Sequence, residues 1–343
     1  VSVTLAGFAT AVREGLNLAV GQSVNLNITM KVSAVQEEVI VTGDAVWCAT
    51  AEAALLRFDR VTRRFQAITR EPGTIASNHL TSLAFDRVGR LWVGTFESGV
   101  SRLAADGTSW ELVNAFDGLP GDSVTTITVA GDTLWIGTRG GIALWDGRQV
   151  LGSLPDGNTV SFDTTFSSPA ITGVAQLRDT LWLSTPRGVG FARTTTNLSD
   201  WRKANDGLPT LTVDRLASDG MVLLAQVAGS IYRWEPGSQQ WSPIPFFGNV
   251  LNLKEDHGSI LASTSTGIWR YLAGTVLFEL IPGSQDVGPI GGDDPEPSLG
   301  PPGSPGYYAG SSDGLWERPE ATGVWTLHTP AAPPGNTYAN IVI

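Results

Sequence analysis

A short pattern recurs seven times along the 343-residue chain, and it constrains the fold more than any other feature. An apolar or aromatic pair leads to a small residue, usually Thr, and then to a Gly-containing turn and a second apolar run. The copies read VWCATAEAALL (46–56), LWVGTFESGVSRL (91–103), LWIGTRGGIALW (134–145), LWLSTPRGVGFA (181–192), LLAQVAGSIYRW (223–234), ILASTSTGIWRY (260–271) and YYAGSSDGLWER (307–318). The equivalent hydroxyl-type positions are Thr50, Thr95, Thr138, Thr185, Gln226, Thr264 and Ser311. Each copy predicts two short strands joined by a tight turn.

The flanks of each copy repeat as well. An alternating strand precedes most copies, as in LTSLAFDRVGR (80–90), and an outer strand with an aromatic residue follows, as in SWELV (109–113). Four antiparallel strands in a unit of 40–50 residues are the signature of a β-propeller blade. We therefore predict an all-β fold, with a seven-bladed β-propeller over residues 44–343. The hydrophobic fraction of 42% is sufficient for such a core.

The chain contains 12 tryptophans, which fall into register with the repeat. One strand of the unit carries Trp47, Trp92, Trp135 and Trp182, and the outer strand carries Trp110, Trp201, Trp241 and Trp325. A position fixed once per repeat is what packing between blades requires, although a stacking platform for sugars is the functional alternative. We predict that the first group fills the core between blades.

The repeats resemble two-component regulator propeller repeats. The likeness rests on FDGLPGDSVTTITVAGDTLWIGTRGGIALW (116–145) and NHLTSLAFDRVGRLWVGTFESGV (78–100). In that family such propellers form the periplasmic sensing part of membrane histidine kinases, and related propellers occur in secreted proteins. The resemblance implies the fold, but it does not extend to signalling, because these residues include no membrane span or kinase sequence.

Residues 1–43 differ from the repeat and resemble the closing half of a carboxypeptidase-regulatory-like β-sandwich. The likeness rests on a Gly-Phe strand end, the "LAVGQ" strand and the final "EEVIVTG". It implies a small N-terminal β-sandwich remnant and an exported protein of a Gram-negative bacterium, secreted or located at the cell surface or in the periplasm. Val1 opens directly into an alternating strand, so we expect a processed end or a point within a longer protein.

The charge balance argues against two classes of partner. Lys and Arg number 22 and Asp and Glu 33, which gives a net charge of −11 without any basic run. Binding to nucleic acid needs clustered cations, and an anionic membrane surface repels such a chain. The longest uncharged stretch, 321–343, contains Pro330, Pro333, Pro334 and Gly335, which are incompatible with a spanning helix. We expect no nucleic acid partner and no membrane insertion.

The sequence offers only weak candidates for catalytic residues. His79, His257 and His328 fall at unrelated positions of the repeat, where surface turns are the simpler interpretation for the first two. The sequence GSSDG (310–314) matches G-x-S-x-G, but it lies in a repeated hairpin and not in the strand–turn–helix context of a nucleophile. The single cysteine, Cys48, lies in an apolar run typical of a buried thiol. We predict a non-enzymatic protein without a cofactor.

One acidic segment is a candidate for a cation. Asp293, Asp294 and Glu296 in GGDDPEP (291–297) offer oxygen ligands to calcium. Their spacing fits no standard calcium loop, and a solvated rim loop is the alternative.

The loops between the second and third strands of each blade lie on one face around the axis, and they are the candidate ligand-binding face. This face carries Glu52, Glu97, Arg139, Arg187 and Asp313. Mixed charges around a funnel suit a polar small molecule, glycan or peptide, whereas a water-filled channel mouth is the alternative. Long links at 154–169 and 287–305 lie outside the repeat, and function is often grafted onto such loops.

Three functions remain open. The first is a recognition module for a glycan, a peptide or a protein. The second is a structural subunit of an extracellular filament or surface assembly, joined to copies of itself by exchange of terminal strands. The third is a propeller lyase or hydrolase.

The two ends compete for one position, because seven innermost strands are needed and eight candidates exist. Residues 285–292 precede the seventh copy as a poor candidate, and residues 37–43 and 336–343 both alternate well. A ring closes most securely when one terminus completes a blade begun by the other. We therefore expect 337–343 to close the first blade beside 45–50. In the alternative, 38–42 fill this position and the C-terminal strand is free to pair elsewhere.

Overall fold

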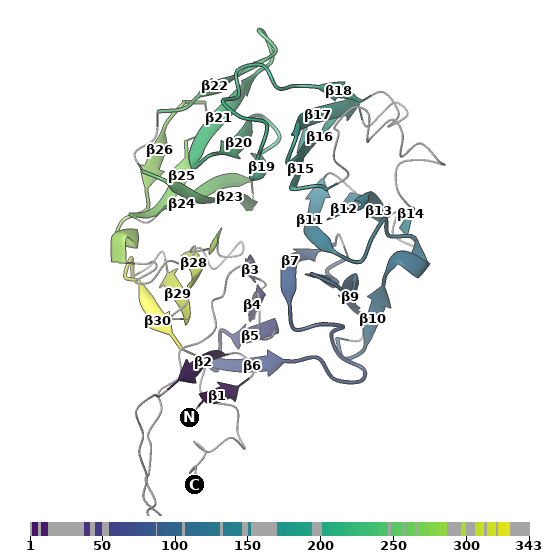
Figure 1. Ribbon diagram of the computed structural model, residues 1–343. Coiled ribbons are helices and arrows are strands. Elements are labelled where there is room, and N and C mark those ends of the chain that lie inside the picture. The colour runs from purple at the N-terminus through teal and green to yellow at the C-terminus, as the bar shows by residue number, and fades with distance from the viewer. Residues whose placement is uncertain are drawn as a thin grey trace, which may run out of the picture.

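The structure is a computed structural model, and it is all-β. Seven four-stranded antiparallel sheets form a ring, which is the predicted seven-bladed β-propeller (Figure 1). A separate hairpin pairs β1 (Ser2–Leu5) with β2 (Phe8–Val12). The described residues are 2–5, 8–12, 38–41, 45–49, 55–86, 88–104, 107–130, 133–145, 150–151, 170–193, 201–245, 248–256, 258–264, 266–272, 274–286, 296–299, 306–311, 314–319 and 322–329.

Each blade runs outward from the axis in chain order. The innermost strands are β3 (Glu38–Val41), β7 (Leu80–Phe85), β11 (Val124–Ala130), β15 (Gly173–Leu177), β19 (Arg215–Ser218), β23 (Val250–Asp256) and β27 (Glu296–Leu299). The second strands are β4 (Ala45–Ala49), β8 (Leu91–Thr95), β12 (Thr133–Thr138), β16 (Thr180–Thr185), β20 (Leu223–Val227), β24 (Ser259–Thr264) and β28 (Gly306–Ser311).

The third strands are β5 (Leu55–Asp59), β9 (Val100–Leu103), β13 (Gly141–Trp145), β17 (Gly188–Arg193), β21 (Ser230–Glu235), β25 (Gly267–Tyr271) and β29 (Gly314–Pro319). The outermost strands are β6 (Arg64–Ile68), β10 (Trp110–Val113), β14 (Val150–Leu151), β18 (Arg202–Lys203), β22 (Gln240–Pro243), β26 (Phe278–Leu280) and β30 (Thr326–His328). Within these ranges the helical turns are 3₁₀ only, η1 (Ala115–Asp117) and η2 (Ser284–Asp286), and no helix there has the length and hydropathy of a membrane span.

The core lies between the blades. Each junction between neighbouring blades has its own hydrophobic cluster, because both faces of every sheet must be covered. All five residues of the second strand are buried in β4, β8 and β20. The predicted burial of the first tryptophan group is confirmed, with exposed fractions of 8% or less for Trp47, Trp92, Trp135 and Trp182.

The ring closes through the N-terminal segment. Strand β3 pairs with β4, with Val39 opposite Cys48 and Ile40 opposite Trp47. The expectation that 337–343 occupy this position is therefore wrong, and the alternative with 38–42 is confirmed. The physical reason is proximity, since β3 and β4 are separated only by residues 42–44 and a short loop costs little entropy to close. Residues 337–343 lie outside the described residues.

Blade 7 also differs from the sequence expectation. Its innermost strand is β27, with Glu296 opposite Gly310, and not 285–292. Residues 284–286 form η2 because the hydroxyl of Ser284 accepts a hydrogen bond from the Ile268 amide at 2.9 Å and is 3.2 Å from its carbonyl oxygen. These contacts hold the segment against β25, away from the axis.

The N-terminal boundary moves as well. The sandwich expected for 1–43 is not shown, and one of the three described strands of that segment, β3, belongs to the first blade.

Candidate functional site

The turns between the second and third strands share one construction in four blades. A buried threonine closes each turn, and its hydroxyl donates a hydrogen bond to the carbonyl oxygen of the glycine that begins or precedes the third strand. The pairs are Thr95–Gly99 at 2.8 Å, Thr138–Gly141 at 3.0 Å, Thr185–Gly188 at 3.1 Å and Thr264–Gly267 at 3.0 Å. The same hydroxyls accept from turn amides of Ser98, Gly140, Arg187 and Thr266. The recurring threonine therefore builds the turn, and its 0% exposure keeps it from a ligand.

The recurring glycine has a related reason. Gly188 has a φ of 127°, and a Cβ there would lie 2.6 Å from Oδ1 of Asn205. At Gly99, which has a φ of 74°, a Cβ would lie 2.3 Å from the carbonyl oxygen of Val113. In both blades the chain that leaves the outer strand packs directly on the turn. In these two blades the turns and the links therefore lie on the same face of the ring.

Three of the five predicted ligand-binding residues are described, and all three are exposed on this face. Glu97 lies in the turn between β8 and β9, Arg139 between β12 and β13, and Arg187 between β16 and β17. Glu52 and Asp313 lie outside the described residues.

An aromatic side chain that sequence analysis missed joins two of these turns. Phe96 is 47% exposed, and the guanidinium carbon of Arg139 from the next blade lies 4.8 Å from the centre of its ring. Among the described residues no carboxylate pairs with Arg139. A cation over an aromatic ring is a weak contact at an exposed site, so both groups stay available to a ligand.

Polar groups lie next to Phe96. The carboxylate of Glu97 accepts a 2.6 Å hydrogen bond from the hydroxyl of Ser77, and its other oxygen is 3.4 Å from Nδ1 of His79. The side chains of His79 and Glu97 remain 57% and 46% exposed. We call Phe96, Arg139, Glu97 and His79 the platform. It offers an aromatic ring, a cation, an anion and an imidazole on two neighbouring blades.

The sequence also singled out three histidines and one cysteine as candidates. His79 is exposed as expected and belongs to the platform, whereas His257 lies outside the described residues. Burial raises the pKa of the Cys48 thiol to about 12, which is the behaviour of a structural cysteine.

The calcium candidates are not brought together by the described chain. Glu296 begins the innermost strand β27, so it is not part of a loop, whereas Asp293 and Asp294 lie outside the described residues. Within the described ranges no three acidic, His or Cys side chains gather as metal ligands would.

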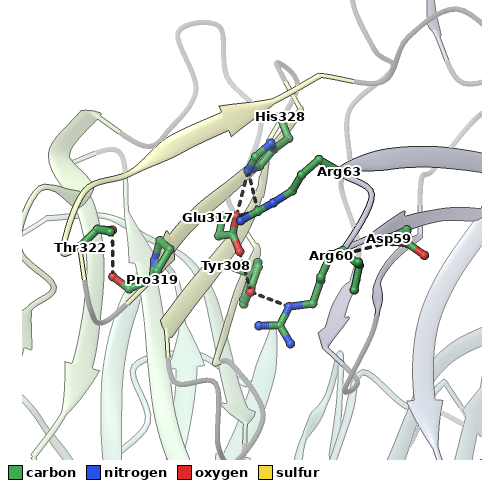
Figure 2. Close-up of polar contacts among 9 residues, drawn as sticks. Asp59, Arg60, Arg63, Tyr308, Glu317, Pro319, Thr322 and His328 are labelled. Carbon is green, nitrogen blue, oxygen red and sulfur yellow. Dashed lines mark hydrogen bonds and ion pairs between the residues drawn. The ribbon is translucent and has the colours of Figure 1, made fainter.

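Sequence analysis also missed a polar network at the opposite ends of the strands, where blade 7 meets blade 1 (Figure 2). Glu317 lies at its centre and is 5% exposed. It contacts Arg63, Tyr308 and His328, and Tyr308 in turn contacts Arg60. A usable signal existed in the repeat. The equivalent position of the third strand is Arg57, Arg102, Arg233 and Arg270 in blades 1, 2, 5 and 6, but Glu317 in blade 7.

The comparisons with known proteins agree with the fold. The family model described as two component regulator propeller matches residues 74–97, which span β7, β8 and the turn that carries Phe96. A comparison with curated protein sequences finds no match.

Solved structures of other propellers are similar to this chain. PorZ, described as a bacterial surface component of the type-IX secretion system of Porphyromonas gingivalis, is 15% identical with a TM-score of 0.65, covering 91% of this chain and 40% of its own. The extracellular domain of a putative one component system from B. thetaiotaomicron is 16% identical with a TM-score of 0.59, covering 86% and 39%. The WD40 β-propeller domain of Doa1 is 11% identical with a TM-score of 0.57, covering 87% and 97%.

These identities show the fold alone. The chain spans about 40% of the length of the first two structures, so what those whole proteins do is not carried over with the fold.

Proposed function

We propose that this chain is an exported, non-enzymatic propeller that recognises a glycan, a peptide or a protein through the face of the ring that carries the platform. The exposed Phe96 under Arg139 carries this proposal. Exposed aromatic and arginine side chains supply most of the binding energy at protein interfaces, and aromatic faces also stack on sugars.

The arrangement of charges supports a polar ligand. Glu97 and Arg139 present opposite charges beside the same aromatic ring, and Arg187 adds a second exposed cation on blade 4. Such a set of side chains can bind hydroxyl, amide and carboxylate groups. Within the platform no nucleophilic side chain is hydrogen-bonded to a general base. The platform is therefore suited to binding.

The proposal that this protein is exported rests on its similarity to two solved structures. Two of the similar structures are described as a bacterial surface component of Porphyromonas gingivalis and as an extracellular domain of a B. thetaiotaomicron protein. Assembly through exchange of terminal strands stays a prediction, and the position of β3 of the same chain in the first blade leaves this alternative open.

Binding of the purified chain to immobilised arrays of bacterial oligosaccharides and of peptides tests the proposal. Phe96→Ala and Arg139→Gln should each weaken binding about thirtyfold to the array members that the wild type binds, the effect of a typical interface hot spot. Phe116→Ala is the matched control, because Phe116 is 98% exposed in η1, outside the platform. Wild-type binding by both platform variants, or no array member bound by the wild type, overturns the proposal.

A further inference from the structure

Blade 7 departs from the repeat at two positions, and both departures lie at its junction with blade 1. The second strand has tryptophan or leucine at one position in the other blades and tyrosine here. The equivalent residues are Trp47, Trp92, Trp135, Trp182, Leu224, Leu261 and Tyr308. In the third strand, Glu317 stands where four blades have arginine. In each of those four blades the arginine pairs with a carboxylate of its own sheet, as in Arg102–Glu111 and Arg270–Glu279.

In blade 7 the ion pair at this position crosses the junction to the neighbouring blade. The carboxylate of Glu317 binds the guanidinium of Arg63, which lies in the turn between β5 and β6 of blade 1. The same carboxylate accepts a hydrogen bond from Nε2 of His328 on β30 at 3.0 Å. Figure 2 shows the three side chains converging across the gap between the two blades.

Tyr308 extends this coupling toward the core. Its hydroxyl donates to Glu317 at 2.9 Å and accepts from Nε of Arg60 at 3.0 Å. Its ring packs in the cluster that joins Val46, Cys48 and Phe58 to blade 7. Tyr308 is thus a core residue whose hydroxyl completes the polar network, which tryptophan or leucine could not do.

This junction differs from the other six in connectivity. Blade 1 is built from β3–β6 and blade 7 from β27–β30, so no strand is shared between the two ends of the ring. Every other pair of neighbouring blades is consecutive in the chain. In a repeat array each unit is held only by its neighbours, so the first and last units need side-chain contacts to stay together.

We propose that the carboxylate of Glu317 locks blade 7 to blade 1, and that protonation of this carboxylate opens the ring at this junction. A buried carboxylate is stable only when it is paired and hydrogen-bonded. Once it is protonated, the guanidinium of Arg63 loses its ion pair with this carboxylate.

The electrostatics fix the direction of the pH effect. Burial raises the pKa of Glu317, but hydrogen bonds from Arg63, Tyr308 and His328 and the charge of Arg63 outweigh it and hold the pKa below its ordinary value. The lock therefore stabilises the ring above the ordinary glutamate pKa of about 4.3 and is lost as the pH falls through the lower folded value.

The other titratable groups of the junction do not reverse this direction. Burial and the neighbouring Glu317 carboxylate raise the pKa of Tyr308 to about 12, so its hydroxyl stays protonated. Asp59 of the adjoining hairpin accepts hydrogen bonds from Val61 and Thr62 of its own turn and lies beyond Arg60 in Figure 2.

Thermal unfolding of Glu317→Gln between pH 3 and pH 7 tests the lock. At pH 7 the variant should unfold about 5 °C below the wild type, because the neutral amide of Gln replaces a buried carboxylate that pairs with Arg63. The difference should shrink as the pH falls below the ordinary glutamate pKa of about 4.3, because protonation then favours the unfolded wild-type chain. Glu279→Gln is the matched control, because it removes an exposed ion pair with Arg270 that lies within a single blade. Equal Tm values for Glu317→Gln and wild type at pH 7, or a difference that does not shrink as the pH falls below about 4.3, overturn the proposal.

Hydrogen exchange tests where the ring opens. Tyr308→Phe keeps the aromatic side chain in the core and removes only its hydroxyl. This variant therefore tests the proposal even if Glu317→Gln does not fold. Amides of β5 and β28 should exchange at least tenfold faster in the variant at pH 7, and those of β16 at the wild-type rate. Faster exchange in all blades alike, or in none, refutes local opening.

Discussion

The replacement of Thr185 by valine separates a structural hydroxyl from a ligand-binding one. The side chain is fully buried, and its hydroxyl donates to the carbonyl oxygen of Gly188 at 3.1 Å and accepts from the amide of Arg187 at 3.0 Å. Valine keeps the volume and removes both hydrogen bonds. A net value of about 1 kcal/mol for each bond gives a loss of about 2 kcal/mol in the free energy of unfolding.

Chemical denaturation and thermal unfolding measure this loss. In a chain of this size about 2 kcal/mol corresponds to a decrease in Tm of about 4 °C. Binding to the oligosaccharide and peptide arrays should not change, because the hydroxyl does not reach the surface. Thr180→Val on the same strand is the control, since its half-buried hydroxyl makes only a 3.3 Å contact with Asp179.

Two results would refute the structural reasoning. One is a Tm of Thr185→Val equal to that of the wild type. The other is an equal loss of stability in Thr180→Val, which would show that the turn hydrogen bonds contribute nothing of their own.

Two further outcomes follow from the geometry. Gly207→Ala should lower the free energy of unfolding by about 2 kcal/mol more than Gly220→Ala. Both glycines have a positive φ, but only at Gly207 would a Cβ lie 2.0 Å from the Trp241 carbonyl oxygen. Equal losses of stability in denaturant titrations would contradict this. Cys48, with its pKa raised to about 12 by burial, should resist iodoacetamide at pH 8.5 until denaturant unfolds the chain, and fast labelling of the native protein would show that the thiol is accessible.

Sequence alone was sufficient for the number of blades and for most of their strands, because the contacts that form a blade are local. Each sheet pairs strands that follow one another in the chain, so alternation and turn residues within one repeat determine them. Trp92 and Trp182 were placed in the core for the same reason, since a side chain in register with the repeat must face the neighbouring blade.

The candidate site was predictable only in outline. Glu97, Arg139 and Arg187 were correctly placed on exposed turns, because the turn follows from the hairpin. That Phe96 lies under Arg139 depends on how two neighbouring blades pack, and 43 residues separate the two side chains in the chain. The pattern within one repeat carries no information about such a contact.

The closure of the ring was decided by the tertiary structure. Two terminal segments had equally good strand patterns, and the short connection between β3 and β4 gave the position to the N-terminal one. Arg63 and Glu317 are 254 residues apart in the chain and meet only when the seventh blade returns to the first. The repeat determines each blade because its strands are neighbours in sequence, whereas the lock between the two ends depends on the ring itself, which only the complete set of blades creates.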